Sequence, residues 1–290
     1  MIGYYILLSI RRIKINYWNK REEMAAKAIT HAADMLKRYQ DEINSSVECT
    51  SIYDSYNINY NINIKVSTIN NSNPNNSTNV FLVDIDTIAA ANYVNTKYGG
   101  KVAILNFASY KNAGGKYKEG SSAQEEFLCH HSTLYNVLSC FEKIYYRENR
   151  ININHSLYLN KALYSPSIIF EYCNMFFKAD VITCAAPNKS AAKKYSNISD
   201  KENFEELEKR IKFLFDIAMV QKVDTLVLGA WGCGVFGQNP TEVARLFKKY
   251  IDETAGYFKN IVFAIPDKTS NNYIKFKEVL NPCKDLFWSE

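Results

Sequence analysis

Runs of consecutive apolar residues recur along the chain and predict strands that are buried on both faces of a sheet. They cover residues 80–85, 102–108, 180–186, 225–230 and 260–265. Residues 57–66 differ, because apolar side chains take every second position there, which is typical of a strand with one solvent-exposed face. Shorter strands are expected at 156–159 and 167–170, so the chain supplies enough strands for a sizeable sheet.

Between these runs, apolar side chains recur at spacings of three and four, which predicts amphipathic helices. The expected helices are 22–40, a helix from Ile88 to the Gly99-Gly100 pair, one continuous helix from Gln124 to Tyr145, 201–220, and two helices that begin at Pro240 and near Asn271. Polar residues predict loops at 70–78 and 188–200. Strands that alternate with helices indicate a three-layer α/β/α sandwich.

The N-terminal region is expected to be an addition to this sandwich. Residues 1–8 are apolar and precede two arginines, but the run is far shorter than the roughly 20 residues that a membrane helix needs. The charges follow the apolar part and no cleavage site is clear, which argues against a signal peptide. A strand or a flexible extension would explain this run, and the helical spacing that follows makes the addition helical. We expect an extension at 1–20 and one domain at 21–290.

The composition allows a packed core and excludes several functions. The 290 residues are 47% hydrophobic, which suits a large α/β domain rather than a disordered chain. The net charge of +5 suits an anionic ligand but is too small to indicate sequence-specific nucleic-acid binding. Seven cysteines without a CxxC pair and four histidines form no zinc pattern. We therefore expect no metal, no cofactor, and a reduced intracellular protein, cytoplasmic or nuclear.

Residues 113–128 contain the central candidate for a functional site. Three glycines precede a helix start, where backbone can approach a ligand closely and free N–H groups can bind an anion. Glu125 and Glu126 lie side by side in the first helical turn, where a carboxylate can exchange a proton with a bound sugar phosphate. As a structural alternative, Ser122 and Glu125 fit a capping box, but that motif leaves Glu126 unexplained.

A second glycine loop follows the strand at 225–230. Gly232, Gly234 and Gly237 precede a helix whose cap is Asn239, and this order favours a phosphate cradle built from successive N–H groups. The spacing fits neither a Walker loop nor GxGxxG, and a tight turn is the structural alternative. Phe236 favours the ligand site, because a ring between two loop glycines can stack on a sugar or base. Both loops follow strands, and ligands of open α/β sheets bind at that edge.

Gly114, Gly115 and Lys116, followed after seven residues by Gln124-Glu125-Glu126, resemble the signature GGG-x(6–8)-QEE of the poly(ADP-ribose) glycohydrolase family. Further blocks similar to the microbial branch of that family occur in order at 105–109, 134–135, 164–166, 185–188, 229–237 and 262–265. The resemblance covers most of residues 20–280. It implies a macrodomain-like fold, with a mixed sheet in three α/β/α layers and additions at the N-terminus.

The resemblance also implies roles for the matching positions. Glu126 would protonate the departing oxygen of a ribose–ribose bond and then activate the attacking water. Glu125 would bind ribose hydroxyls, and Gln124 would fix the loop. Adenine would lie near residues 263–267. The other implied substrate contacts are Asn106, Ser109 or Asn112, Gly114, Gly115, Lys116, Gly232, Cys233, Gly234, Val235, Phe236 and Gly237.

The substrate implied is poly(ADP-ribose) or an ADP-ribosylated protein, with ADP-ribose as product and no role for a membrane. Lys116 departs from the signature, because the family has a third glycine there. Its side chain either blocks the approach of the backbone to the ligand or adds a cation that pairs with a phosphate. Three other functions therefore stay open: a hydrolase of single ADP-ribose units, a non-catalytic ADP-ribose-binding macrodomain, and an α/β protein whose two loops are only turns.

Overall fold

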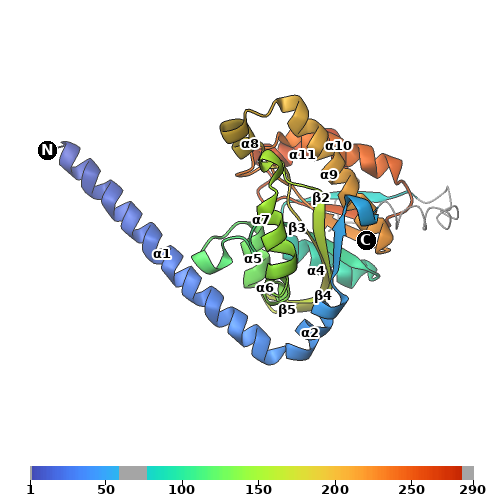
Figure 1. The fold of residues 1–290 in the computed structure, drawn as a ribbon, viewed down its shortest axis with the longest axis horizontal. Coiled ribbons are helices and arrows are strands. Elements are labelled where there is room, and N and C mark those ends of the chain that lie inside the picture. Colours follow the sequence, from blue (N-terminus) through green and yellow to red (C-terminus); the bar gives the residue numbers. More distant parts are fainter. Residues whose placement is uncertain (1, 59–76, 283–290) are drawn as a thin grey trace.

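Within the described residues, seven strands form one mixed sheet that lies between two layers of helices (Figure 1). The computed structural model describes the backbone of residues 2–58 and 77–282, and the side chains of these residues from Asn19 onward. The sheet has the order β1-β4-β5-β3-β6-β7-β2. The strands are β1 (Ser51–Asp54), β2 (Asn79–Val83), β3 (Val102–Phe107), β4 (Lys161–Tyr172), β5 (Met175–Cys184), β6 (Thr225–Leu228) and β7 (Asn260–Ala264).

Helices cover both faces of this sheet. The α-helices of the described residues are α1 (Ile2–Arg38), α2 (Gln40–Cys49), α4 (Thr87–Tyr98), α5 (Gln124–His130), α6 (Leu134–Ser139), α7 (Arg147–Ile151), α8 (Lys189–Ser196), α9 (Asp200–Val220), α10 (Pro240–Glu253) and α11 (Asn271–Leu280). Because side chains alternate along a strand, Ala103 and Leu105 of β3 pack with α9, α10 and α11, whereas Val102 and Ile104 pack with α4, α5 and α6. The prediction of a three-layer α/β/α sandwich is confirmed.

The long apolar runs are confirmed as the central strands β3, β5 and β6 and their neighbours β7 and β2. Residues 167–170 lie inside the longer strand β4, and the sequence interpretation missed the edge strand β1. The strand expected at 57–66 and the loop expected at 70–78 lie mostly outside the described residues; Asn57 and Ile58 belong to a helical turn. The β5–β3, β3–β6, β6–β7 and β7–β2 pairs are parallel, whereas β1–β4 and β4–β5 are antiparallel.

The single helix expected from Gln124 to Tyr145 is wrong. Helix α5 ends at His130, and residues 131–133 leave the helix to bind the edge of β4. The N–H of Thr133 donates to the carbonyl of Ile169 at 3.0 Å, and the N–H of Glu171 donates to the carbonyl of His131 at 2.9 Å. These tertiary bonds replace helical ones, which a periodic apolar pattern cannot reveal.

Two other local predictions are wrong. The strand expected at 156–159 is a 3-10 turn, Asn154–Ser156, with positive φ values at 154–156 and 158. The loop expected at 188–200 contains helix α8, whose N-terminus is capped by the side chain of Asn188. The cap explains why a polar segment is helical, because it satisfies a backbone N–H that would otherwise lack a partner.

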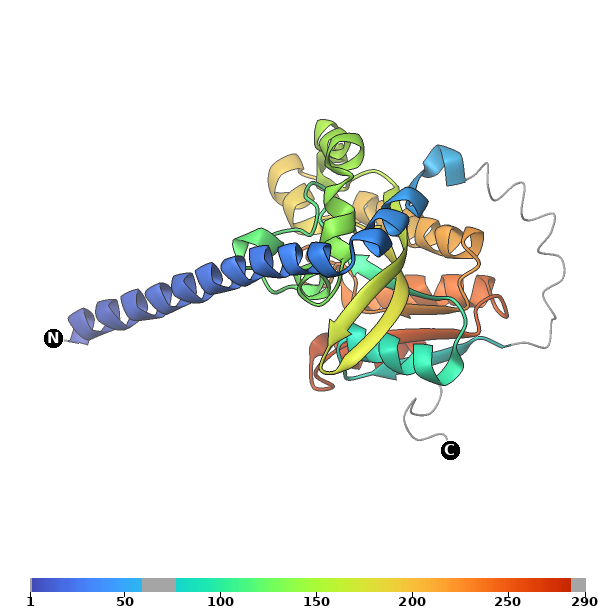
Figure 2. The same cartoon turned by 90° about the horizontal axis from the view of Figure 1, so that it is seen from below.

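Helix α1 runs without a break from Ile2 to Arg38, so the strand or flexible extension expected for its start is wrong, and the helical addition is confirmed. Its N-terminal part projects from the rest of the chain, whereas its C-terminal part lies along the domain (Figures 1 and 2). Ala28 and Met35 are buried there, whereas Ile29 and Leu36, one position further round the helix, are exposed. No helix in the described ranges combines the length and apolar character that crossing a bilayer demands.

Candidate active site

Both glycine loops follow neighbouring parallel strands at the centre of the sheet. Strand β3 ends at Phe107 and leads into the loop before α5, and β6 ends at Leu228 and leads into the loop before α10. Because β3 and β6 pair in parallel, their carboxyl ends meet at one edge of the sheet. The topology therefore brings together two loops that are more than 100 residues apart in the sequence.

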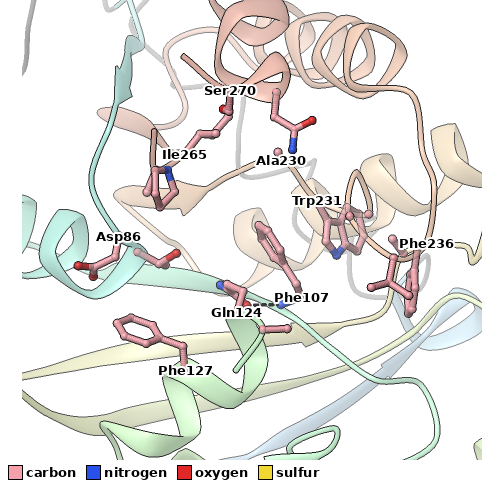
Figure 3. A pocket seen from close by; sticks show the side chains of 18 of the residues that line it. Asp86, Phe107, Gln124, Phe127, Ala230, Trp231, Phe236, Ile265 and Ser270 are labelled. Carbon is pink, nitrogen blue, oxygen red and sulfur yellow. Dashed lines mark hydrogen bonds between the residues drawn. The ribbon is translucent and has the colours of Figure 1, made fainter. Parts of the chain in front are cut away.

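A cleft of about 600 Å³ opens at this edge. Figure 3 shows Phe236 and Trp231 at one end, Asp86, Phe127 and Ile265 at the other, and Gln124 between them. Of the residues predicted to bind substrate, five line the cleft: Gln124, Gly232, Gly234, Val235 and Phe236. The others do not line it: Asn106, Ser109, Asn112, Gly114, Gly115, Lys116, Glu125, Glu126, Cys233 and Gly237.

The two carboxylates lie behind the cleft wall, where the first turn of α5 meets the first glycine loop. Glu125 is 3% exposed and Glu126 is 6% exposed. The N–H of Ser109 donates to Glu125 at 2.6 Å, and the amide of Asn106 donates to it at 3.2 Å. The N–H of Lys116 donates to Glu126 at 2.8 Å. The site is therefore a buried acidic pair held by backbone and amide donors.

The capping box proposed for Glu125 does not form. The residue before the helix is Ala123, and no side chain caps the helix there. Glu125 instead accepts a hydrogen bond from the N–H of Ser109, in the loop that follows β3. Helix capping therefore does not explain why Glu125 is buried. Gln124 stabilises the start of α5 instead. Its side-chain amide accepts a hydrogen bond from the Phe107 N–H at 2.8 Å and donates one to the Leu105 carbonyl at 2.9 Å. These bonds tie the start of α5 to β3.

Gly115 lets the loop backbone touch both carboxylates. A Cβ atom at this position would lie 2.6 Å from a Glu126 oxygen and 2.8 Å from a Glu125 oxygen. Its φ of +61° also belongs to the region that glycine adopts readily. The next residue, Lys116, has a φ of −109° and needs no glycine. Its side chain points away from the cleft and is 62% exposed, so it does not block the backbone.

Burial raises the pKa of Glu125 to about 8, because the charged form loses its hydration. The Ser109 N–H lowers that pKa in part, and the charge of Glu126 raises it further. Glu125 therefore keeps its proton at neutral pH. A neutral acid beside a second carboxyl group is an arrangement suited to proton transfer at a glycosidic oxygen.

The second loop is open at its tip, whereas the glycines at its two ends, Gly232 and Gly237, are packed against neighbouring side chains. Gly234 has no atom within 4 Å of the position that a Cβ would take, and Val235 is 88% exposed. Phe236 packs against Tyr158 with ring centroids 6.2 Å apart and also lines the cleft. Trp231 lines the cleft too, and its buried indole N–H has no hydrogen-bond partner among the described residues.

The sequence interpretation missed several residues of the cleft: Asp86, Phe127, Trp231, Ser270 and Asn272. Asp86 precedes α4 and caps it through a bond from the Ala89 N–H, so its local role conceals its position in the cleft. Phe127 fits the apolar spacing of helix α5, which conceals its position in the cleft. Asp86 lies far from both glycine loops in the sequence, Phe127 directly follows the Gln-Glu-Glu motif, and the fold brings both to the cleft.

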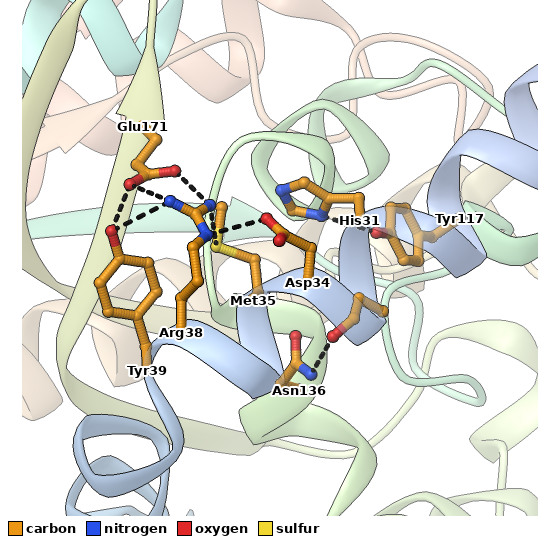
Figure 4. A network of polar contacts seen from close by, with 9 residues as sticks. His31, Asp34, Met35, Arg38, Tyr39, Tyr117, Asn136 and Glu171 are labelled. Atoms are coloured by element: carbon orange, nitrogen blue, oxygen red, sulfur yellow. Dashed lines mark hydrogen bonds and ion pairs between the residues drawn. The ribbon is translucent and has the colours of Figure 1, made fainter.

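Helix α1 holds the first glycine loop from outside (Figure 4). The hydroxyl of Tyr117 donates to the Ala28 carbonyl at 2.8 Å and lies 2.9 Å from His31 Nδ1. The guanidinium of Arg21 donates to the Glu119 carbonyl at 2.9 and 3.1 Å. The same helix is fixed to β4 by two hydrogen bonds that the Arg38 guanidinium donates to the Glu171 carboxylate. The loop that touches the acidic pair is thus fastened to a helix outside the sandwich.

The fold and site define a macrodomain-like α/β domain with a buried acidic pair held against the first glycine loop. The chain belongs to the microbial-type poly(ADP-ribose) glycohydrolase (PARG) family, because the model of the family's catalytic domain matches residues 20–171.

Solved structures agree with this assignment. The Thermomonospora curvata PARG bound to the inhibitor ADP-HPD is 26% identical, with a TM-score of 0.76 over 89% of this chain and 99% of that one. The Deinococcus radiodurans PARG in complex with ADP-ribose is 28% identical, with a TM-score of 0.74 over 83% of this chain and 98% of that one. No curated protein matches the chain.

Proposed function

We propose that this chain hydrolyses the ribose–ribose bonds of poly(ADP-ribose) and releases ADP-ribose, with Glu126 as general acid and base. The proposal rests on family membership and on one observation: the intact Gln-Glu-Glu motif forms a buried acidic pair between the cleft and a glycine loop. Two similar proteins are bound to an inhibitor or to ADP-ribose in their structures, which supports a ligand of this class.

The dimensions and lining of the cleft suit an ADP-ribose unit. The adenine ring would lie between apolar walls formed by Phe127, Ile265 and Pro266, which fits the position expected near residues 263–267. The diphosphate would lie on the N–H groups of the open loop around Gly234, and the terminal ribose would pack on Phe236. This order brings the anomeric carbon of that ribose towards the start of α5, where Glu126 lies.

The reaction then needs one proton-transfer group acting twice. The proton that the acidic pair holds passes from Glu126 to the ribose oxygen that leaves, while the bond between that oxygen and the anomeric carbon breaks. The resulting carboxylate takes a proton from water, whose oxygen forms the new bond to the anomeric carbon. Glu125 and the Ser109 N–H position the ribose hydroxyls and the loop. The products are ADP-ribose and a polymer shortened by one unit.

The test is the release of ADP-ribose from purified polymer by the wild type and by Glu126→Gln. The glutamine keeps the shape of the side chain and an acceptor for the Lys116 N–H, so we expect normal folding and at least a ~100-fold loss of kcat. Glu48→Gln, an exposed change on α2, serves as control and should turn over normally. Near-normal turnover by Glu126→Gln would remove Glu126 from the mechanism. If wild type releases ADP-ribose only from single-unit acceptors, or binds without product, the alternative functions replace this one.

A further inference from the structure

A second hollow, of about 570 Å³, lies where helix α1 meets the first glycine loop. Helix α1 contributes Lys20, Arg21 and Met24, and the loop contributes Lys116 and residues 120–123. Ser122 and Ala123 line this hollow and also the cleft, so the start of α5 separates the two. We call this second hollow the basic hollow.

The basic hollow carries an excess of positive charge. Three cationic side chains line it and no acidic side chain does, among the residues that the structure describes. Glu119 approaches from the rim, 3.9 Å from the Lys116 amine and 4.0 Å from the Arg21 guanidinium, and is 62% exposed. Three positive charges and one negative charge leave a local excess of two, which matches the charge of a diphosphate.

Lys116 joins the basic hollow to the acidic pair. Its backbone N–H binds Glu126 at 2.8 Å, and the residue also lines the hollow. Arg21 is held in place by its bonds to the Glu119 carbonyl, so one cation of the hollow is already positioned before any ligand enters. A ligand group that leaves Glu126 on the side opposite the cleft therefore meets positively charged side chains.

We propose that the basic hollow binds the diphosphate of the polymer unit on the leaving side of the scissile bond; this rests on the proposed function. The terminal unit occupies the cleft, and the bond to be cut lies at Glu126. The unit that leaves carries its own diphosphate and must lie beyond Glu126, where the hollow begins. The lysine that replaces the third signature glycine thus favours substrates with at least two linked ADP-ribose units over a single unit.

The test measures polymer binding separately from chemistry. In an inactive Glu126→Gln background, Lys20→Ala with Lys116→Ala should weaken polymer binding about threefold to tenfold and make it less sensitive to salt. Affinity for free ADP-ribose, measured by calorimetry, should not change, because ADP-ribose fills only the cleft. The matched control Lys27→Ala with Lys111→Ala removes two exposed lysines of the same helix and loop that do not line the hollow. Arg21 is left intact because it holds the loop.

Equal polymer affinity for the double variant and its control would overturn the proposal. An equal loss of affinity for polymer and for ADP-ribose would also overturn it, because the lysines would then act on the cleft. Both results are independent of turnover. If the active wild type releases no ADP-ribose from polymer, the proposed function fails, whereas the binding comparison in the inactive background still decides the role of the hollow.

Discussion

The two glycine loops lie side by side at the sheet edge, but Gly115 of the first is tightly packed and Gly234 of the second is not. The first loop touches buried carboxylates through Gly115 and is tied to α1 by Tyr117. The second loop exposes Val235 and leaves empty space around Gly234. Packing within the protein requires a glycine at position 115, because a Cβ there would clash with both carboxylates. No neighbouring atom requires a glycine at position 234. The difference favours a first loop that fixes the acidic pair and a second loop whose tip leaves its backbone accessible to a ligand.

The largest effect that can test this comparison is expected from Gly115→Ala. The new Cβ would lie within 3 Å of oxygens of both Glu125 and Glu126, and φ is +61°. The carboxylates or the loop must move, so we expect about a 100-fold loss of kcat/KM and a loss of stability of about 1–3 kcal/mol. Initial rates and urea unfolding measure the two. Unchanged kcat/KM would mean that the contact between the loop and the acidic pair has no role in turnover.

Gly234→Ala is the matched change in the second loop. Its φ lies outside the left-handed region and no atom lies within 4 Å of the new Cβ, so we expect the melting temperature to stay the same. If the backbone there contacts a diphosphate, the methyl group should weaken ADP-ribose binding about tenfold. Calorimetry and thermal unfolding separate the outcomes. A large loss of stability with unchanged affinity would reverse the comparison between the loops.

The pH dependence of stability tests whether Glu125, which packs against Gly115 of the first loop, keeps a proton in the folded chain. The pKa of Glu125 is raised from 4.5 to about 8, so between these values the folded chain keeps a proton that the unfolded chain releases. This contribution to stability is complete below about pH 4.5 and is lost as the pH rises to about 8.

Glu125→Gln removes that titration and should therefore gain stability relative to wild type as the pH rises. We expect the difference in free energy of unfolding to change by about 1–2 kcal/mol between pH 6.5 and pH 8. Urea titrations at both pH values measure it, with Glu119→Gln as an exposed control. A difference that is the same at both pH values would show that Glu125 does not hold a proton in this range.

The smallest effect is expected where α1 holds the first loop. Tyr117→Phe removes the hydroxyl that donates to the Ala28 carbonyl and contacts His31. The buried carbonyl loses a partner, so we expect a loss of about 1 kcal/mol and a modest decrease in kcat. Tyr135→Phe, whose ring packs on Tyr117 at 4.8 Å, is the control for a nearby hydroxyl. Equal effects of the two changes would show that the tie between α1 and the loop contributes nothing specific.

Predictions from the sequence succeeded where the local structure depends on neighbouring residues in the chain. The apolar runs of β3 and β6 and the glycine loops after them could be identified by pattern alone. The acidic pair could be singled out because the capping box left Glu126 without a role. Predictions failed where a distant partner decided the outcome: α5 stops at His130 because the next residues bind β4.

By itself, the sequence of this protein determined the alternation of strands and helices, the two glycine loops, and the Gln-Glu-Glu motif, because periodicity and backbone conformational freedom are local properties. Only the tertiary structure decided that Asp86 and Phe127 share a cleft with Gly234, and that Lys20 lies beside Lys116. It also decided that Glu125 keeps a proton, since the pKa depends on burial among residues from several elements. The spatial neighbours of a side chain are set by packing over the whole sheet, which no local pattern encodes.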